Sequence, residues 1–218
     1  MTDSFESNSA FLANDLCRDC GICCDGVLFT YVELSEDEAG ALAGKGLDIY
    51  RNEKDKPVFN LRCNRFGEQG CTLYQDRPKT CQAYYCDLTR AVMNESISFE
   101  DARTQVMDLK QSSAWLLENA PEEIDLMQEG KEEEGEMPEI LSLAFLKKAN
   151  TDTPEANGLR NTLYKALRYF DSKPWPQSFT ELEQEFAFRA FEHLKRVDRY
   201  FGKTRLLVKY AGLVQKLR

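Results

Sequence analysis

The sequence predicts an α+β protein that is mainly helical: a small cysteine-rich domain with few short strands, followed by a helical C-terminal region. Two observations carry this prediction. All eight cysteines fall between positions 17 and 86, in a stretch that is also rich in glycine and polar residues. Beyond about residue 98, apolar side chains recur every three or four residues, as they do on one face of a helix. We therefore expect a cysteine-cluster domain over residues 1–97 and a helical region over residues 98–218.

The cysteine-cluster domain is expected to hold few regular elements. Residues 1–16 look like a short arm, with a helical turn around residues 11–12. Residues 27–32 are dense in β-branched and aromatic side chains, which predicts a strand. Residues 58–61 predict a second short strand that leads into the cysteine at position 63.

Two helix N-termini are marked by capping residues. Ser35 and Glu38 have the spacing of a capping box, so a short helix should start there and stop at the glycines of 44–46. Ser98 and Asp101 resemble a second N-terminal cap, where an acidic residue also suits the helix dipole. This second cap is expected to open the helical region.

Three amphipathic segments follow in the C-terminal half. They span residues 157–170, 178–201 and 204–218, and the second begins with a Ser178/Glu181 capping box. In the second segment one stripe is formed by Phe179, Leu182, Phe186, Ala190, Leu194, Val197 and Phe201. Spacings of three and four throughout predict a helix for each segment.

The charge distribution limits the class of partner. The formal net charge is −9, which argues against nonspecific binding to nucleic acid or to anionic membranes. Residues 121–139 hold nine acids against one lysine, and their centre, residues 128–138, is expected to be a solvated acidic linker. The remaining candidate partner is a protein that contacts the C-terminal helices.

The sequence favours a cytoplasmic location. Its longest apolar stretches fall far short of the roughly 20 residues that cross a bilayer, and its acidic N-terminus has no apolar signal region. In the reducing cytosol structural disulfides rarely persist. Eight clustered cysteines in such a chain therefore indicate a metal site more than a disulfide framework, which is the alternative.

The first cysteines have the spacing of metal ligands. Cys17, Cys20 and Cys23 form a C-x2-C-x2-C motif, and Gly21 within it supplies the positive φ that a chain wrapped around a metal often needs. Bacterial-type [4Fe–4S] proteins use this triple spacing, with a distant cysteine as the fourth ligand. Structural zinc sites usually present two separate knuckles, which the second half of the cluster lacks. The candidate ligands are Cys17, Cys20, Cys23, Cys24, Cys63, Cys71, Cys81 and Cys86.

The adjacent pair Cys23 and Cys24 adds a constraint. Neighbouring residues of an extended chain point to opposite sides, so both can join one site only through a turn. Either the two serve two centres, or one is a metal ligand and the other is packed or redox-active. His193 is the only histidine and lies in a helical pattern far from the cluster, so the ligands should be nearly pure thiolate. Soft ligands of this kind select zinc, Cu(I) or iron–sulfur centres.

The second half of the cluster makes the pattern specific. A C-x-x-C-x-x-C-C run is followed by Cys63 and then by C-x-x-Y-x-x-R-P-x-x-C-x-x-Y-x-C, which includes Tyr74, Arg77 and Pro78. This arrangement resembles the YkgJ-type cysteine-cluster family, which is described as zinc- or iron-chelating, and the cysteine-cluster part of flagellin lysine methylase. The resemblance covers about residues 17–90. It implies metal or iron–sulfur binding and no particular reaction.

The preferred interpretation is thus a protein that holds an iron–sulfur cluster, most simply [4Fe–4S], with Zn²⁺ as the alternative cofactor. Arg77 is expected to offset thiolate charge or bond carbonyls near the site, or else to pair with a surface acid. Two other functions stay open. One is an enzyme, either lysine methylase-like or redox. The other is an interaction adapter in which the metal stabilises the fold and the helices contact the partner.

Overall fold

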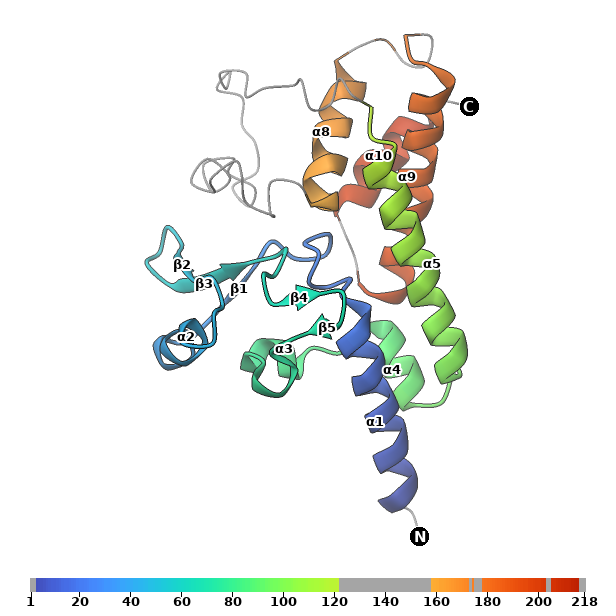
Figure 1. Ribbon diagram of the computed structural model, residues 1–218. Coiled ribbons are helices and arrows are strands. Elements are labelled where there is room, and N and C mark those ends of the chain that lie inside the picture. Colours follow the sequence, from blue (N-terminus) through green and yellow to red (C-terminus); the bar gives the residue numbers. More distant parts are fainter. Residues whose placement is uncertain (1–2, 122–157, 173, 175–177, 203–204, 216–218) are drawn as a thin grey trace.

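The computed structural model describes residues 3–121, 158–172, 174, 178–202 and 205–215. Most of these residues are helical, and two small sheets lie to one side of the helices (Figure 1). The prediction of a mainly helical α+β protein is confirmed. The acidic linker expected at residues 128–138 lies outside the described residues.

The chain begins with a long helix and not with an arm. Helix α1 spans Asp3–Cys20 and includes the first two cysteines in its last turn. Ala13, Leu16 and Cys20 are all buried, at spacings of three and four, and α1 packs against α4 and α5. The prediction of a short arm over residues 1–16 was wrong because Cys20 acts as an apolar residue that completes this helical face.

A three-stranded antiparallel sheet follows. It is built from β1 (Tyr31–Glu33), β2 (Tyr50–Arg51) and β3 (Pro57–Asn60) in the order β1-β3-β2, with Val32 opposite Phe59. The strand predicted at 58–61 is confirmed within one residue. The strand predicted at 27–32 is present only at its end. The N–H of Val27, at the start of that segment, is bonded to an Asp25 carboxylate oxygen at 2.9 Å instead of to a strand.

The first predicted capping box is present. Helix α2 spans Glu36–Ala43, the Ser35 hydroxyl accepts from the Glu38 N–H, and the Glu38 carboxylate accepts from the Ser35 N–H at 3.1 Å. The helix ends at Gly44, as expected. Together with the sheet it encloses a smaller core, made of Val32, Leu34, Ala39, Leu42, Leu47, Phe59, Cys63 and Leu73.

A short hairpin and two single turns connect the sheet to the main helices. The hairpin pairs β4 (Phe66–Gly67) with β5 (Gly70–Cys71). It is followed by a 3-10 turn, η1 (Tyr74–Asp76), and a five-residue helix, α3 (Lys79–Ala83). These small elements carry two of the cysteines.

The cap predicted at Ser98 is present, and a short helix that was not predicted precedes it. Helix α4 spans Asp87–Met93 and α5 spans Phe99–Glu118, and the Ser98 hydroxyl accepts from the Asp101 N–H at 3.0 Å. In Figure 1, α5 runs from beside α4 to the C-terminal helices. It therefore connects the cysteine-rich part of the chain with the rest.

Three further helices complete the fold. They are α8 (Leu159–Asp171), α9 (Glu181–Tyr200) and α10 (Arg205–Gln215), which confirms the three amphipathic segments where they are described. The apolar stripe predicted for residues 178–201 is buried except at Leu182, whose side chain is 50% exposed.

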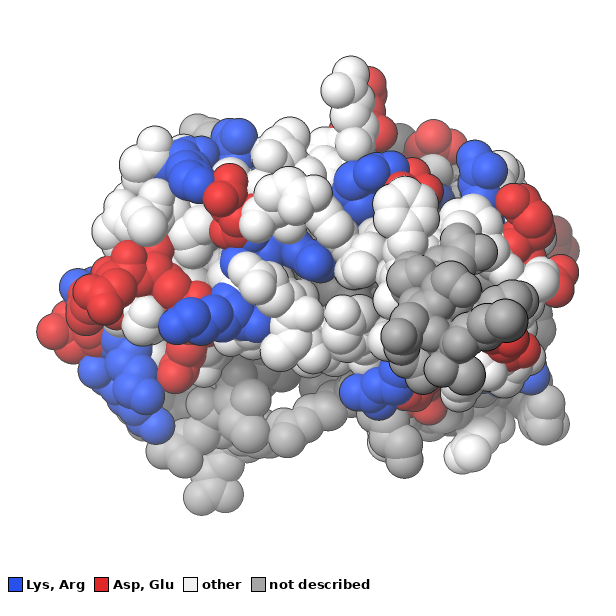
Figure 2. Space-filling view, turned by 90° about the horizontal axis from the view of Figure 1, so that it is seen from below, with Lys and Arg blue, Asp and Glu red and all other residues white. Residues whose placement is uncertain are grey.

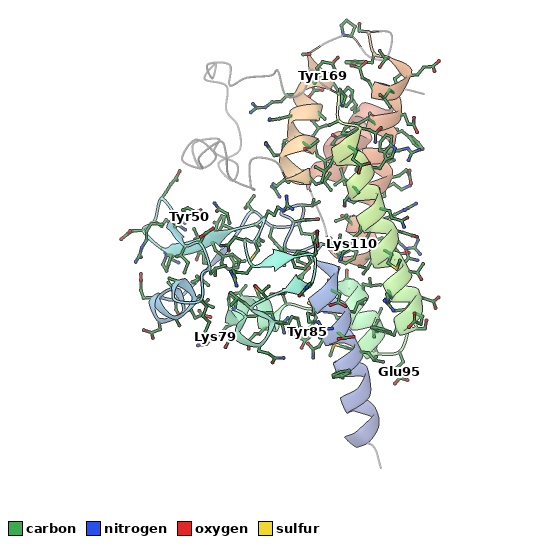
Figure 3. The ribbon with its side chains drawn as sticks, in the orientation of Figure 1. Tyr50, Lys79, Tyr85, Glu95, Lys110 and Tyr169 are labelled. Atoms are coloured by element: carbon green, nitrogen blue, oxygen red, sulfur yellow. The ribbon has the colours of Figure 1, made fainter. Side chains whose placement is uncertain are left out.

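The capping box of α9 is shifted by two residues from its predicted place. The cap is Thr180 with Glu183. Glu183 is buried and also accepts a hydrogen bond from the hydroxyl of Tyr169 on α8, labelled at the top of Figure 3. This contact between helices fixes the box at Thr180 and not at Ser178.

One large core joins the first cysteines to the C-terminal helices. It contains buried residues from α1, the 22–27 segment, α4, α5, α8, α9 and α10. Deep within it, the Tyr210 hydroxyl donates to the Leu163 carbonyl at 2.9 Å. The core is continuous across the domain boundary that the sequence predicts between residues 97 and 98.

The surface carries both signs of charge. On the face shown in Figure 2, basic and acidic side chains are interspersed. No helix in the described part of the chain combines the length and apolar character that crossing a membrane requires. Three exposed apolar side chains on the C-terminal helices, Leu182, Phe188 and Val208, lie in the region where a protein partner is predicted.

Candidate metal centre

The eight cysteines are gathered from several elements, and all are free thiols. Cys17 and Cys20 lie three residues apart on the last turn of α1 and therefore face the same side. Cys23 and Cys24 follow in a turn. The other four lie singly after β3 (Cys63), on β5 (Cys71), on α3 (Cys81) and at the N-cap of α4 (Cys86).

Gly21 reverses the chain between these pairs. Its φ is 77°, and a Cβ at this position would collide with the ring of Phe66, so both the backbone and the space require glycine. Its carbonyl accepts from the N–H groups of Cys24 and Asp25 at 2.8 and 3.1 Å. The predicted positive φ is confirmed. The tight turn brings Cys23 back beside the end of α1.

Five cysteines, Cys17, Cys20, Cys23, Cys24 and Cys86, line one small cavity of about 50 Å³. Cys17, Cys20, Cys23 and Cys86 are called the first thiol set, because Cys24 also packs against the smaller core. Cys20 and Cys86 are buried in the main core. The apolar walls are supplied by Leu16, Ile22, Leu88, Val106 and Phe201. The motif C-x2-C-x2-C and one distant cysteine therefore meet in a largely apolar enclosure.

The other four cysteines, the second thiol set, are Cys24, Cys63, Cys71 and Cys81. Cys63 is buried in the smaller core, and the other three are half-buried and pack against that core. The Cys63 N–H donates to the Cys24 carbonyl at 2.8 Å, which holds these two residues together. Cys24 also borders the cavity of the first set, so the two sets are neighbours.

Burial keeps these thiols protonated in the absence of a cation. It raises the pKa of Cys20, Cys23 and Cys24, and it raises that of Cys81 to about 12. Smaller contributions come from neighbouring thiols. For Cys23 these include Cys20 and Cys86, whereas for Cys24 and Cys81 they come chiefly from the second set. A metal ion that takes up these sulfurs must displace their protons.

Arg77 lies beside the thiols, as one of its predicted roles requires. Its Nη1 is 3.8 Å from the Cys17 Sγ, and its Nε donates to the Tyr74 carbonyl at 3.0 Å. The guanidinium stacks on the Tyr74 ring at 3.7 Å, and the Tyr74 hydroxyl donates to the Asn14 carbonyl at 2.7 Å. The positive charge of Arg77 lowers the pKa of Cys17 against the larger effect of burial, which raises it.

The C-terminal helices close the site, which the sequence did not reveal. The Tyr84 hydroxyl donates to the Phe201 carbonyl at 2.6 Å, and Phe201 itself lines the cavity. Arg160 of α8 donates to the carbonyls of Gly26 and Val27 at 2.9 and 3.3 Å. Only Tyr84 had a sequence signal, as part of the second cysteine motif. Phe201 and Arg160 are distant in sequence and had none.

Lys110 of α5 fastens the end of α1. Its Nζ donates to the Asp19 carbonyl at 2.5 Å, and it lies 5.8 Å from the centre of the Phe66 ring. Figure 3 shows Lys110 at the junction of α5 with the cysteine-rich part. A cation at the carbonyl end of a helix satisfies acceptors that have no partner within the helix. Lys110 thus holds the turn that carries Cys17 and Cys20.

A buried carboxyl, Asp25, lies next to the cysteine turn. Burial raises its pKa to about 7, and the Val27 N–H, Arg62 and Arg160 act in the opposite direction. It had no sequence signal as a buried acid. Its hydrogen bond to Val27 shapes the segment after Cys24.

The structure places the candidate ligands near one another without forming a finished coordination shell. Across the described residues, which include all eight cysteines, no three His, Cys, Asp or Glu side chains stand close enough to hold a metal ion as they are. His193 lies outside the site: it is buried between α5 and α9, with its Nδ1 3.1 Å from the Ser112 hydroxyl. The soft donors that line the cavity are therefore the cysteine thiols.

These features define a thiol-rich region whose sulfur donors are of the kind that binds soft metal ions. Comparison with protein families agrees. Residues 16–107 match the model of the CxxCxxCC family, described as "Putative zinc- or iron-chelating domain". The match includes all eight cysteines and extends into α5, and it confirms the resemblance seen in the sequence. No curated protein and no solved structure matches the chain.

Proposed function

We propose that this protein binds an iron–sulfur cluster, most simply [4Fe–4S], through Cys17, Cys20, Cys23 and Cys86. The observation that carries the proposal is the cavity in which these four thiols meet. Three come from a C-x2-C-x2-C motif and one is distant, which is the ligand pattern of bacterial-type clusters. The family description supports metal binding in general and leaves iron and zinc open.

The protein residues around the cavity suit an iron–sulfur cluster. Leu16, Ile22, Val106 and Phe201 exclude water from the sulfurs. Arg77 places a positive charge beside Cys17, where four thiolates would otherwise accumulate negative charge. The bound metal supplies the positive charge that makes the thiolate form favourable at neutral pH.

Zinc is the alternative metal, because four thiolates also form a closed structural zinc site. Spacing favours iron at the first set, because that set has the triple motif of bacterial-type clusters. For iron or zinc, the thiols have to move closer together, because no three of them are placed to bind one metal ion. Metal binding should therefore be coupled to ordering of this region.

The deciding experiment is anaerobic purification followed by measurement of iron, acid-labile sulfide, zinc and the absorption spectrum. We expect brown protein with iron and sulfide in equal amounts and a broad band near roughly 400 nm, where thiolate-bound clusters absorb. Colourless protein with stoichiometric zinc would contradict the iron–sulfur assignment but not metal binding. Protein that contains neither metal, with fewer than eight free thiols, would contradict both.

A Cys20→Ser variant tests the assigned ligands. It should lose the iron and the absorption band, because Cys20 is buried at the cavity and supplies one of the four proposed ligands. A Ser112→Ala variant is a control, since Ser112 lies on α5 near His193 and should keep the full metal content. Full iron in the Cys20→Ser protein would remove Cys20 from the ligand set.

A further inference from the structure

We propose that the domain holds a second metal centre, bound by Cys24, Cys63, Cys71 and Cys81 and separate from the one at the first thiol set. This inference rests on the proposed metal-binding function and adds the number of centres and the ligands of each. Its four sulfur donors, with no histidine or carboxylate among them, fit a closed zinc site.

The turn between the two cysteine pairs is the first argument. Cys23 and Cys24 both line the first cavity, and the carbonyl of Cys24 is in addition bonded to the N–H of Cys63 at 2.8 Å. The backbone at Cys24 is thus tied to a member of the second set. The pair can therefore supply one ligand to each of two centres, with Cys24 tied through its backbone to the second set.

The second argument is that the two sets belong to different cores. Cys20 and Cys86 are part of the main core formed with the helices. Cys63 is part of the smaller core beneath the three-stranded sheet, and Cys24, Cys71 and Cys81 all pack against that same core. A single centre would have to draw thiols out of both cores at once.

The third argument is that the second set is already held together by backbone hydrogen bonds. The Cys63 carbonyl accepts from the Phe66 N–H at 3.1 Å, and Phe66 pairs with Cys71 across the hairpin. Cys81 lies on α3, whose Lys79 N–H donates to the Glu38 carboxylate at 2.9 Å and so fixes α3 to α2. Three separate segments therefore bring three cysteines to the smaller core.

Arg77 is positioned to serve both centres. It contacts Cys17 directly, and its charge also acts on Cys81, where it partly offsets the effect of burial. Two neighbouring thiolate centres would share this guanidinium. Cys17 of the first set also contributes to the raised pKa of Cys24 and Cys81, as expected for neighbouring sets.

Metal counts on as-purified protein test the inference. Iron and zinc per chain are measured for the wild type, for Cys86→Ser, for Cys81→Ser and for the double variant, with circular dichroism as a check on helix content. We expect Cys86→Ser to lose only the metal of the first set and Cys81→Ser to lose only that of the second. The double variant should lose both, so that the two losses add up to the wild-type content.

Because Cys81 lies within the five-residue helix α3, Cys71→Ser on the hairpin serves as a second variant with the same expected result. The inference is overturned if any one of these variants, with its helix content intact, loses all metal, or if both second-set variants keep all of it. Wild-type protein that contains no metal would contradict the proposed function itself, and that outcome is distinct from either pattern.

Discussion

Arg77 Nη1 lies 3.8 Å from Cys17 Sγ, which places a permanent positive charge beside a thiol whose pKa burial raises. The contact links the two halves of the cysteine pattern, because Cys17 lies on α1 and Arg77 follows η1. It indicates that the Arg-Pro element of the motif supports the metal site electrostatically. Four consequences of this structure can be measured.

Replacement of Arg77 should weaken metal binding. Without the guanidinium, thiolates at Cys17 and its neighbours lose their nearest positive charge, and groups just outside a ligand shell typically affect metal affinity by about 10–100-fold. We expect Arg77→Met to release its metal to a chelator at a correspondingly lower chelator concentration, and Arg77→Lys to recover part of the loss. Arg90→Met is the matched control because Arg90 is exposed and pairs with Asp87. Equal retention in Arg77→Met and the control would contradict the assigned role.

Gly21→Ala should destabilise the protein. A residue with a Cβ is strained at a φ of 77° by about 1–2 kcal/mol, and the new methyl group would also displace the ring of Phe66. We expect the free energy of unfolding from urea denaturation to fall by about 2 kcal/mol or more.

Gly40→Ala is the control for that variant. Gly40 lies within α2 with open space around its Cα, so alanine should stabilise by about 0.5–1 kcal/mol. If both alanine variants changed stability in the same direction, the tight turn at Gly21 would not be the cause.

Tyr84→Phe should loosen the closure of the first cavity. The change removes the hydrogen bond to the Phe201 carbonyl, at a cost of about 1–2 kcal/mol, and leaves one wall less firmly held. We expect lower stability and faster loss of the metal-dependent absorption in air.

Tyr85→Phe provides the comparison for Tyr84. Tyr85, labelled in Figure 3, is half-buried, and no partner for its hydroxyl is found among the described residues. Removal of the Tyr85 hydroxyl should leave both the free energy of unfolding and the rate of metal loss near those of the wild type. A Tyr84→Phe protein that behaves in the same way would show that the C-terminal helices do not protect the cavity.

The buried His193 should make the protein less stable in acid. Burial, together with the nearby charge of Arg196, lowers its folded-state pKa from 6.5 to about 4. Between these values the unfolded chain binds the proton and the folded chain does not, so stability is full above about pH 6.5 and falls as the pH drops toward 4. The upper limit of this loss is about 3 kcal/mol.

A His193→Gln variant tests this slope, because glutamine can still bond Ser112 but does not titrate. We expect its free energy of unfolding, relative to the wild type, to improve as the pH falls from 6.5 to 4. A difference that stays constant over this range would assign the acid sensitivity to other groups.

Local signals in the sequence were sufficient for several elements. The caps at Ser35 and Ser98 are formed by residues three apart, and the stripe of α9 follows from its spacing alone. The cap at Thr180 was missed because Ser178 and Thr180 have the same pattern, and only the contact of Glu183 with Tyr169 of another helix separates them. Helix α1 was missed because its cysteines were counted as ligands and not as part of an apolar face.

The sequence likewise predicted some features of the candidate site and not others. The eight cysteines, Gly21 and Arg77 could be selected from spacing and chemistry. Their assignment to two sets could not, because Cys63, Cys71, Cys81 and Cys86 occur singly and each has suitable spacing for either set. That assignment depends on which core each cysteine joins, which is a property of the tertiary structure.

The most direct test of the central claim is X-ray absorption at the edges of iron and zinc, measured on anaerobically purified protein. Sulfur-only coordination, with metal–sulfur distances of about 2.3 Å, is the result that a thiolate site predicts. For an iron–sulfur cluster, iron–iron scattering should accompany it. A first shell that contains nitrogen or oxygen from the protein, or protein without either metal, would contradict the account.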